Sequence, residues 1–336
     1  MQNKTKSQRF IWIDIMLTLL TLAVMNFFYC GVRTVVLGGI CVAVSLAAEI
    51  ISLRLMHRQF TADDLTCISD AFILFLMLPA VIDFRMAGIA CIFAAIAAKN
   101  IFGGRKNMIF SPAAVGYVFL FTSWKGNLLM YSAPHVHTGV LEKAEHLVNS
   151  ASSIFNTTGR IDYTDFEILM GNLPGPVGTG SILLLAVAAV ILILRRDISA
   201  GAFIGTMAGT AIPALLVPVC NNSLESLKYT LSTNMVLFTA IYIISDKRIA
   251  PSRNYYAFFY GFFIAAFSYV LVITTAKENA IVIVSLLFTP VGLGLRNLEN
   301  KIEGFVKEEK AAVELWEAIK SGEYIIPEDE EAVYEE

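Results

Sequence analysis

The fold of this chain is decided by its first two apolar runs, IWIDIMLTLLTLAVMNFFYC at residues 11–30 and RTVVLGGICVAVSLAAEIISLRLM at residues 33–56. Each run is close to the ~20 apolar residues that cross the hydrocarbon core of a bilayer as a helix. Of all 336 residues, 56% are hydrophobic and only 16% are charged, and the mean hydropathy is +0.66. A soluble domain carries about 25% charged residues. The composition therefore predicts an all-α integral membrane protein.

Together with the apolar runs that follow them, these two runs predict ten transmembrane helices. They are expected at 10–30, 33–56, 68–83, 86–103, 111–131, 181–194, 199–219, 230–245, 255–275 and 278–295. Three of them, at 68–83, 181–194 and 230–245, are short for a straight crossing.

Basic residues favour this number because they mark every second connection. The N-terminus and the connections after spans two, four, six and eight hold Lys4, Lys6, Arg9, Arg54, Arg58, Lys99, Arg105, Lys106, Arg195, Arg196, Lys247, Arg248 and Arg253. The short connections on the other side hold one basic residue each: Arg33, Arg85, Lys228 and Lys277. The positive-inside rule then predicts that both termini are cytoplasmic.

The long segment at 132–180 divides the spans into two sets of five. We expect residues 1–131 and 181–295 to form two inverted five-helix repeats, because an odd number of spans makes the second half start from the opposite face. Residues 132–180 form an outer loop in this scheme. Residues 296–336 form a charged cytoplasmic tail, whose segment 297–320 has the pattern of an amphipathic helix lying on the membrane or on a partner, or simply solubilising the chain.

Spans three and eight are the clearest pair between the halves. Both are short and polar at one end: TCISDAFILFLMLP at Thr66–Pro79 and LSTNMVLFTAIYIISD at Leu231–Asp246. Discontinuous helices of this kind line sites near the middle of the membrane in transporters.

Few charges fall within or at the ends of the spans: Asp14, Glu49, Asp70 and Asp246. Charge in lipid is costly, so such residues are candidates for function. Asp70 is our candidate for an ion pathway, because it opens a short span and could either cap it or meet a cation. The five isolated cysteines and the His135-x-His137 pair do not predict a metal site, no catalytic residue stands out, and the net charge of -3 does not indicate nucleic acid as a partner.

Two glycine-containing stretches are distinctive. In NIFGGRKNMIFSPAAVGYVF at Asn100–Phe119, Gly103 and Gly104 allow a tight turn, Pro112 suits the first turn of a helix, and Gly116 permits close approach. A simple packing turn is the alternative.

The second stretch, MGNLPGPVGTGSILLL, begins at Met170. Its residues Gly171, Asn172, Gly175 and Gly178 precede span six, where backbone N–H groups can face an anion at the helix N-terminus. A rigid re-entrant connection is the alternative there.

Taken in order, FGG, IFSPAAVGYV, GNLPGPVG and SDKRIAP resemble the RnfD/NqrB family, and the likeness runs from about residue 9 to residue 296. The resemblance implies an integral subunit of an Rnf-type ferredoxin:NAD oxidoreductase or of a sodium-pumping NADH:quinone reductase in the cytoplasmic (inner) membrane. Length and loop placement favour the Rnf D subunit. Partners would be the other membrane and peripheral subunits, and Na⁺ or H⁺ would be translocated.

The resemblance also implies a flavin. The family esterifies FMN to the threonine of an S/T-G-A-T segment in the outer loop, and this chain has no such segment. The nearest stretch is SSIFNTTGR, in which Thr158 is the preferred attachment residue and Thr157 the second. The chain also has Ser111 where the family usually has Asn, and Thr179-Gly180-Ser181 where it has a GETS ending. The sequence does not decide whether riboflavin is bound noncovalently.

Two alternatives remain at this stage. Inverted repeats with short facing helices are also the plan of small-solute transporters and channels. A paralogue that keeps the fold but has lost its flavin is the other.

Overall fold

The computed structural model describes residues 8–59, 61–102, 108–136, 139–140, 142 and 147–321. The chain divides into two compact units, Met1–Leu293 and Gly294–Glu336, which are described separately. Gly103 and Gly104 lie outside the described residues.

The first half of the chain is helical. Its elements are α1 (Gln8–Cys30), α2 (Val32–Leu55), the 3-10 turn η1 (Ala62–Leu65), α3 (Thr66–Met77), α4 (Phe84–Phe93) with its π-helical extension η2 (Ala94–Asn100), and α5 (Pro112–Ser123). Gly31 has a φ of 77° between α1 and α2, a conformation that favours glycine, so the chain reverses there within one residue. Pro112 occupies the first turn of α5, where its missing N–H costs no helical hydrogen bond.

The segment between the two halves contains small elements. They are α6 (Lys125–Leu128), β1 (Tyr131–Ser132), β2 (Leu147–Val148), α7 (Ala151–Thr158) and α8 (Asp165–Met170). The two strands pair antiparallel, with Tyr131 opposite Val148. A capping box of Thr164 and Glu167 begins α8, and Gly171 ends it in the left-handed conformation.

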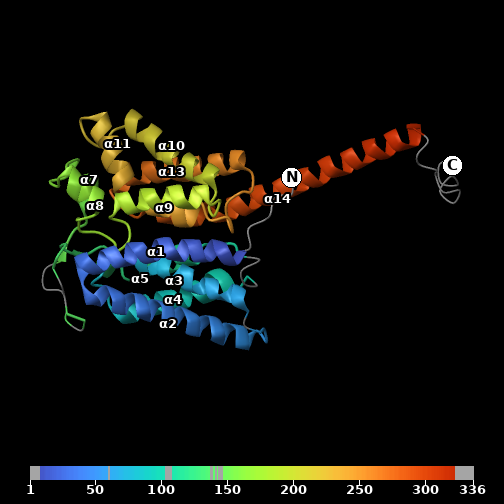
Figure 1. The fold of residues 1–336 in the computed structure, drawn as a ribbon. Coiled ribbons are helices and arrows are strands. Elements are labelled where there is room, and N and C mark those ends of the chain that lie inside the picture. Colours follow the sequence, from blue (N-terminus) through green and yellow to red (C-terminus); the bar gives the residue numbers. More distant parts are fainter. Residues whose placement is uncertain are drawn as a thin grey trace. The chain divides into compact units, whose positions relative to one another are not determined.

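The second half is again helical. Its elements are α9 (Ile182–Leu194), α10 (Ala200–Leu216), α11 (Ser223–Ser232), α12 (Val236–Thr239) with its π-helical extension η4 (Ala240–Ile244), α13 (Asn254–Thr275) and α14 (Ala280–Ser321). In the first unit, α1 to α5 lie together on one side and α9, α10 and α13 on the other, with α7 and α8 at one end (Figure 1).

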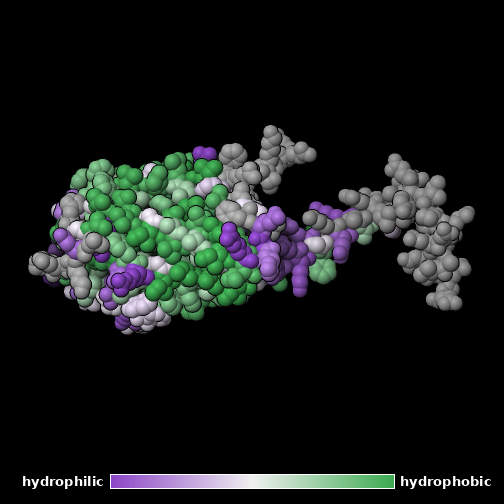
Figure 2. Space-filling view, turned by 90° about the horizontal axis from the view of Figure 1, so that it is seen from below, coloured by the Kyte–Doolittle hydropathy of each residue, from purple (hydrophilic) through white to green (hydrophobic). Residues whose placement is uncertain are grey.

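The apolar surface confirms the prediction of an all-α membrane protein. Figure 2 shows hydrophobic residues over most of the face of the helical bundle that it views, with hydrophilic residues mainly toward its ends. Apolar side chains such as Leu17, Val35, Val190 and Phe267 are exposed on α1, α2, α9 and α13. A soluble monomer rarely exposes so much contiguous apolar area, whereas a lipid-facing surface requires it.

Described helices occupy part of each of the ten predicted ranges, but they differ in length. Four are long and apolar enough to cross a bilayer: Ile11–Cys30, Val32–Leu55, Asn254–Thr275 and Ala280–Lys310. The pair Ser223–Ser232 and Val236–Ile244, bent by 55°, makes a fifth if it is counted as one span. The number ten and the inverted repeats therefore stay predictions.

The break in the predicted eighth span lies at Asn234 and Met235, which both have a positive φ (55° and 57°). The amide of Asn234 is held by the hydroxyl of Ser152 at 3.0 Å, and its side chain pairs with Asn156 of α7. Polar groups of the loop segment thus satisfy the backbone that the break frees, as a discontinuous membrane helix requires.

Candidate functional site

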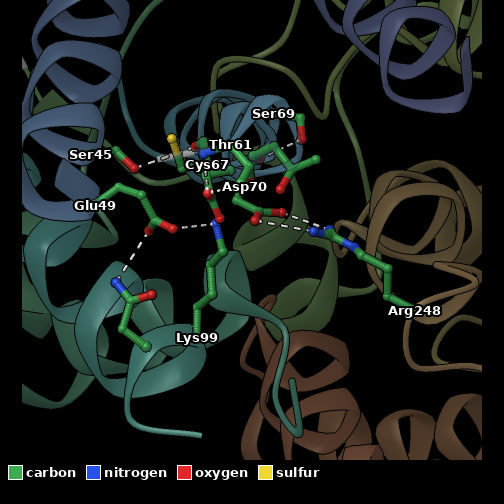
Figure 3. A network of polar contacts seen from close by, with 11 residues as sticks. Ser45, Glu49, Thr61, Cys67, Ser69, Asp70, Lys99 and Arg248 are labelled. Carbon is green, nitrogen blue, oxygen red and sulfur yellow. Dashed lines mark hydrogen bonds and ion pairs between the residues drawn. The ribbon is translucent and has the colours of Figure 1, made fainter. Parts of the chain in front are cut away.

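Five charged residues of the first unit form two ion-paired groups beside one pocket, here called the buried charge network: Glu49, Asp70, Lys99, Asp246 and Arg248. Asp246 and Arg248 are half-buried, and the other three are buried. Figure 3 labels all of them except Asp246. Glu49 on α2 is 0% exposed and Lys99 on η2 is 1% exposed. Their Oε1 and Nζ atoms are 2.7 Å apart, and the side chain of Asn100 donates to the other Glu49 oxygen at 3.2 Å. Each charge is therefore neutralised where no water is available, which is the condition for keeping it charged in a membrane interior.

The π-helix explains how two consecutive residues reach the same carboxylate. Lys99 and Asn100 close the stretch AAIAAKN, which winds with wider turns than an α-helix. Such π segments occur most often at functional sites, because they direct side chains that an α-helix would point elsewhere.

The other end of the network joins residues 178 positions apart in the sequence. Arg248 donates to both oxygens of Asp70, at 2.6 and 3.2 Å, and from Nε to Asp246 at 2.7 Å. Burial lowers the pKa of Arg248, but the two carboxylates outweigh it and raise the pKa, so the guanidinium stays charged. This contact ties α3 to the connection that follows η4.

A small pocket opens between these groups. Ser45, Glu49, Cys67, Asp70, Cys91 and Lys99 line it together with apolar residues of α2 to α5. Carboxylates and a hydroxyl facing one pocket are the groups that hold a hard cation or pass a proton. No group of three or more His, Cys, Asp or Glu side chains with metal-ligand geometry occurs in the part of the chain that the structure describes.

The structure corrects the role that the sequence suggested for Lys99. As a flanking positive charge it would mark the cytoplasmic side, but it is buried and ion-paired. The signal was present in the sequence, because Lys99 falls inside the predicted span 86–103 and Glu49 inside the span 33–56. Two opposite charges inside apolar runs are best explained by a pair.

Arg33 is a second basic residue that is buried instead of lying in a loop. Its guanidinium donates to six backbone carbonyls, those of Ala80, Val81, Ile82, Gly139, Val140 and Glu142, at 2.8 to 3.3 Å. It also stacks over the ring of Phe84, 4.9 Å from the centroid. Arg33 therefore fastens the connection after α3 to the loop segment.

The second glycine stretch lines another pocket, at the end of the first unit that carries the loop segment. Gly171, Gly175, Pro176 and Gly180 form one wall, and residues of α1 and of the strand segment, among them Tyr29 and Ser132, form the rest.

Close backbone packing explains two of these glycines. A Cβ at Gly178 would lie 2.5 Å from Leu76 Cβ, because the Gly178 amide donates to the Leu76 carbonyl at 2.6 Å. A Cβ at Gly171 would lie 2.5 Å from the amide nitrogen of Ser181. Gly175 has open space around it, and a side-chain oxygen of Asn172 is buried without a hydrogen bond.

Of the first glycine stretch, Gly116 packs closely as well. A Cβ there would lie 2.8 Å from Leu74 Cδ2 and 3.0 Å from the carbonyl of Ala90. The residue therefore lets α5 approach α3 and α4, a packing role.

Thr157 and Thr158 lie at the carboxyl end of α7, and both are exposed. Their hydroxyls donate back to carbonyls of the helix, Thr158 to Ile154 at 2.7 Å. Because both hydroxyls are exposed, they are accessible for an ester bond. The carboxyl end of a helix, with its free carbonyl groups, is unfavourable for a phosphate. Neither threonine lines the two pockets described above.

Comparison with known proteins points to a single family. A sequence model of the NQR2, RnfD, RnfE family matches residues 1–291. The B-type subunit of the Na(+)-translocating NADH-quinone reductase of Yersinia pestis is 26% identical over 144 residues, which are 42% of this chain and 35% of that protein. The corresponding subunits of Klebsiella pneumoniae (strain 342; 25% over 147 residues, 43% and 36%) and Neisseria meningitidis serogroup B (26% over 144 residues, 41% and 35%) match similarly. The matched part spans about a third of the length of these curated relatives.

Proposed function

Because this chain belongs to the NQR2, RnfD, RnfE family, we propose that it is the D-type integral subunit of an Rnf-like complex in the cytoplasmic (inner) membrane. Such a complex couples electron transfer between ferredoxin and NAD to the translocation of Na⁺ or H⁺. The observation that carries the proposal is the family match over residues 1–291.

The proposal includes ten spans in two inverted halves with both termini in the cytoplasm. The alternation of basic residues supports it, although Lys99 no longer counts among the markers. The break between α11 and α12 supports it as well, since discontinuous helices are a feature of inverted-repeat membrane proteins.

Within the complex, we assign the buried charge network to ion movement through the first unit. Asp70 lines the pocket together with Glu49 and is held by Arg248 in the second half. A cation or proton that enters the pocket meets carboxylates already paired with Lys99 or Arg248. Displacing such a pair is a step that a change elsewhere in the complex can drive.

The direct test is purification of the native protein from its own membranes by a tag placed after Glu336. We expect further membrane and peripheral subunits to purify with it, and the preparation to move Na⁺ or H⁺ into liposomes when reduced ferredoxin is supplied as electron donor and NAD⁺ as acceptor. A chain that purifies alone and takes up a small solute in liposomes without electron donors would instead be a transporter, the function that its broken helix also allows.

The family's flavin is a separate proposal. We expect the native chain, run on a denaturing gel, to show flavin fluorescence from FMN esterified to Thr158. Thr158→Val should abolish the fluorescence, and Thr157→Val is the matched control, because it removes an equally exposed hydroxyl one residue away.

Fluorescence that survives Thr158→Val but disappears in Thr157→Val would move the attachment by one residue. A native chain without any flavin fluorescence would be the flavin-free paralogue. The purification described above tests independently whether such a chain belongs to the complex. Riboflavin released from the native complex on denaturation would indicate a noncovalent flavin.

A further inference from the structure

Five polar side chains meet at the end of the first unit that carries β1 and α7, away from the buried charge network. They are Tyr117 of α5, Tyr131 of β1, Ser150 at the N-cap of α7, and Glu278 and Asn279 of the connection between α13 and α14, here called the Glu278 cluster. Each is at most 3% exposed. Elements of both halves and of the loop segment thus contribute to one buried polar centre.

Both oxygens of the Glu278 carboxylate accept hydrogen bonds from neutral hydroxyls. Tyr131 donates to Oε1 at 2.5 Å, and Ser150 donates to Oε2. Ser150 is itself fixed, since its oxygen accepts from the amide of Ser153 at 2.9 Å. Donors on both oxygens hold the carboxylate in one orientation and favour its ionised form, whereas burial without a countercharge disfavours that form.

The negative charge of Glu278 has no ion-pair partner among the residues that the structure describes. Its neighbour Lys277 places its ammonium group 5.7 Å from the ring centroid of Phe121 instead. The two hydroxyls that bond the carboxylate are neutral, so they orient the charge without cancelling it. A buried carboxylate without a compensating charge is unfavourable, so Glu278 must either take up a proton or be matched by a bound cation.

Oxygen atoms without partners lie next to this charge. The amide of Asn279 and the hydroxyl of Tyr117 are fully buried and make no hydrogen bond of good geometry, although they lie beside each other. Tyr117 is also close enough to Glu278 to interact with its charge. Buried polar groups almost always have a partner, so two such groups beside an uncompensated carboxylate indicate a bound species.

We propose that the Glu278 cluster binds a dehydrated monovalent cation of the Na⁺ type. Carboxylate, amide and hydroxyl oxygens are the ligands that hard cations select. A single carboxylate matches one positive charge, whereas divalent cations are usually held by several carboxylates or waters. The inference deepens the proposed function by adding a cation site to a chain of an ion-translocating complex, at the opposite side from the cytoplasmic face in the proposed topology.

The test measures cation binding to the full chain by its stability. Thermal unfolding of the detergent-solubilised protein is followed while NaCl replaces choline chloride at constant ionic strength. We expect the midpoint to rise with Na⁺ and to saturate, because a ligand that binds only the folded state stabilises it. Glu278→Gln should remove this dependence, with an apparent Na⁺ affinity at least about tenfold lower.

Glu225→Gln is the matched control, because this exposed carboxylate in the first turn of α11 lies outside the cluster and should leave the Na⁺ dependence unchanged. If Glu278→Gln does not fold, Asn279→Ala and Tyr117→Phe remove neutral oxygens while keeping the charge, and each should weaken the Na⁺ response several-fold.

A wild-type midpoint that does not respond to Na⁺, or a response that Glu278→Gln retains, overturns the site. A midpoint that follows pH through Glu278 but not Na⁺ also overturns it, in favour of a proton. The measurement involves no electron transfer and no partner subunit, so its failure would leave the proposed complex untouched. A chain that purified alone would likewise leave the cation site standing.

Discussion

Replacing Lys99 by Met should lower the free energy of unfolding by about 3–5 kcal/mol, because it leaves the carboxylate of Glu49 buried without a countercharge. Met fills much of the space of the lysine stem, so the loss measures charge and not a cavity. The measurement is reversible unfolding of the chain in detergent, followed by helical circular dichroism.

The double variant Glu49→Gln/Lys99→Met should recover most of this loss, since neither residue then carries a charge. Lys228→Met is the matched control: the pair of Lys228 with Asp165 is even shorter, at 2.5 Å against 2.7 Å, but its side chains are 41% and 76% exposed. An exposed pair contributes at most about 1 kcal/mol. Similar losses of unfolding free energy for Lys99→Met and Lys228→Met would contradict the buried ion pair of Lys99 and Glu49.

The second large effect is expected for Gly205→Ala, which should destabilise the chain by about 3 kcal/mol, the upper end of the usual cost of overpacking. A Cβ at this position of α10 would lie 2.0 Å from the carbonyl oxygen of Phe258 on α13, so the two helices would have to separate. Unlike a flexible side-chain tip, a backbone oxygen inside a helix cannot turn aside. The same assay of unfolding measures the loss.

Gly39→Ala is the matched control, because Gly39 also lies within a long apolar helix but has nothing within 4 Å of the added Cβ. It should leave stability unchanged or raise it by ~0.5–1 kcal/mol, since alanine favours a helix more than glycine does. Equal effects at Gly39 and Gly205 would contradict the close contact of α10 and α13.

The contact of α10 with α13 has a signal in the sequence that the predictions above do not include, the regular spacing of glycines along α10. Gly201, Gly205 and Gly209 repeat every four residues along α10, and Cβ atoms there would lie 2.2, 2.0 and 2.3 Å from carbonyl oxygens of α13. Small residues at this spacing let membrane helices approach at backbone distance. The spacing predicts a helix interface, but nothing in it names α13 as the partner.

Other predictions depended on local signals and agree with the structure for that reason. Pro112 begins α5, and the polar start of the eighth predicted span coincides with the break at Asn234. Backbone conformation follows from a few neighbouring residues, so these features are visible in the sequence.

Hydropathy and helix-breaking residues act over one or two turns, so the membrane class and the approximate positions of the apolar helices could be predicted from the sequence, whereas α7 and α8 in the segment 132–180 could not. Which charges are buried, and which residues they pair with, depends on the folded structure. It paired Glu49 with Lys99, joined Asp70 to Arg248 across 178 positions, and gathered Glu278 with Tyr131 and Ser150. Such partners are selected by the packing of distant helices in a medium of low dielectric constant, where each charge or polar group must find a partner that its own segment does not contain.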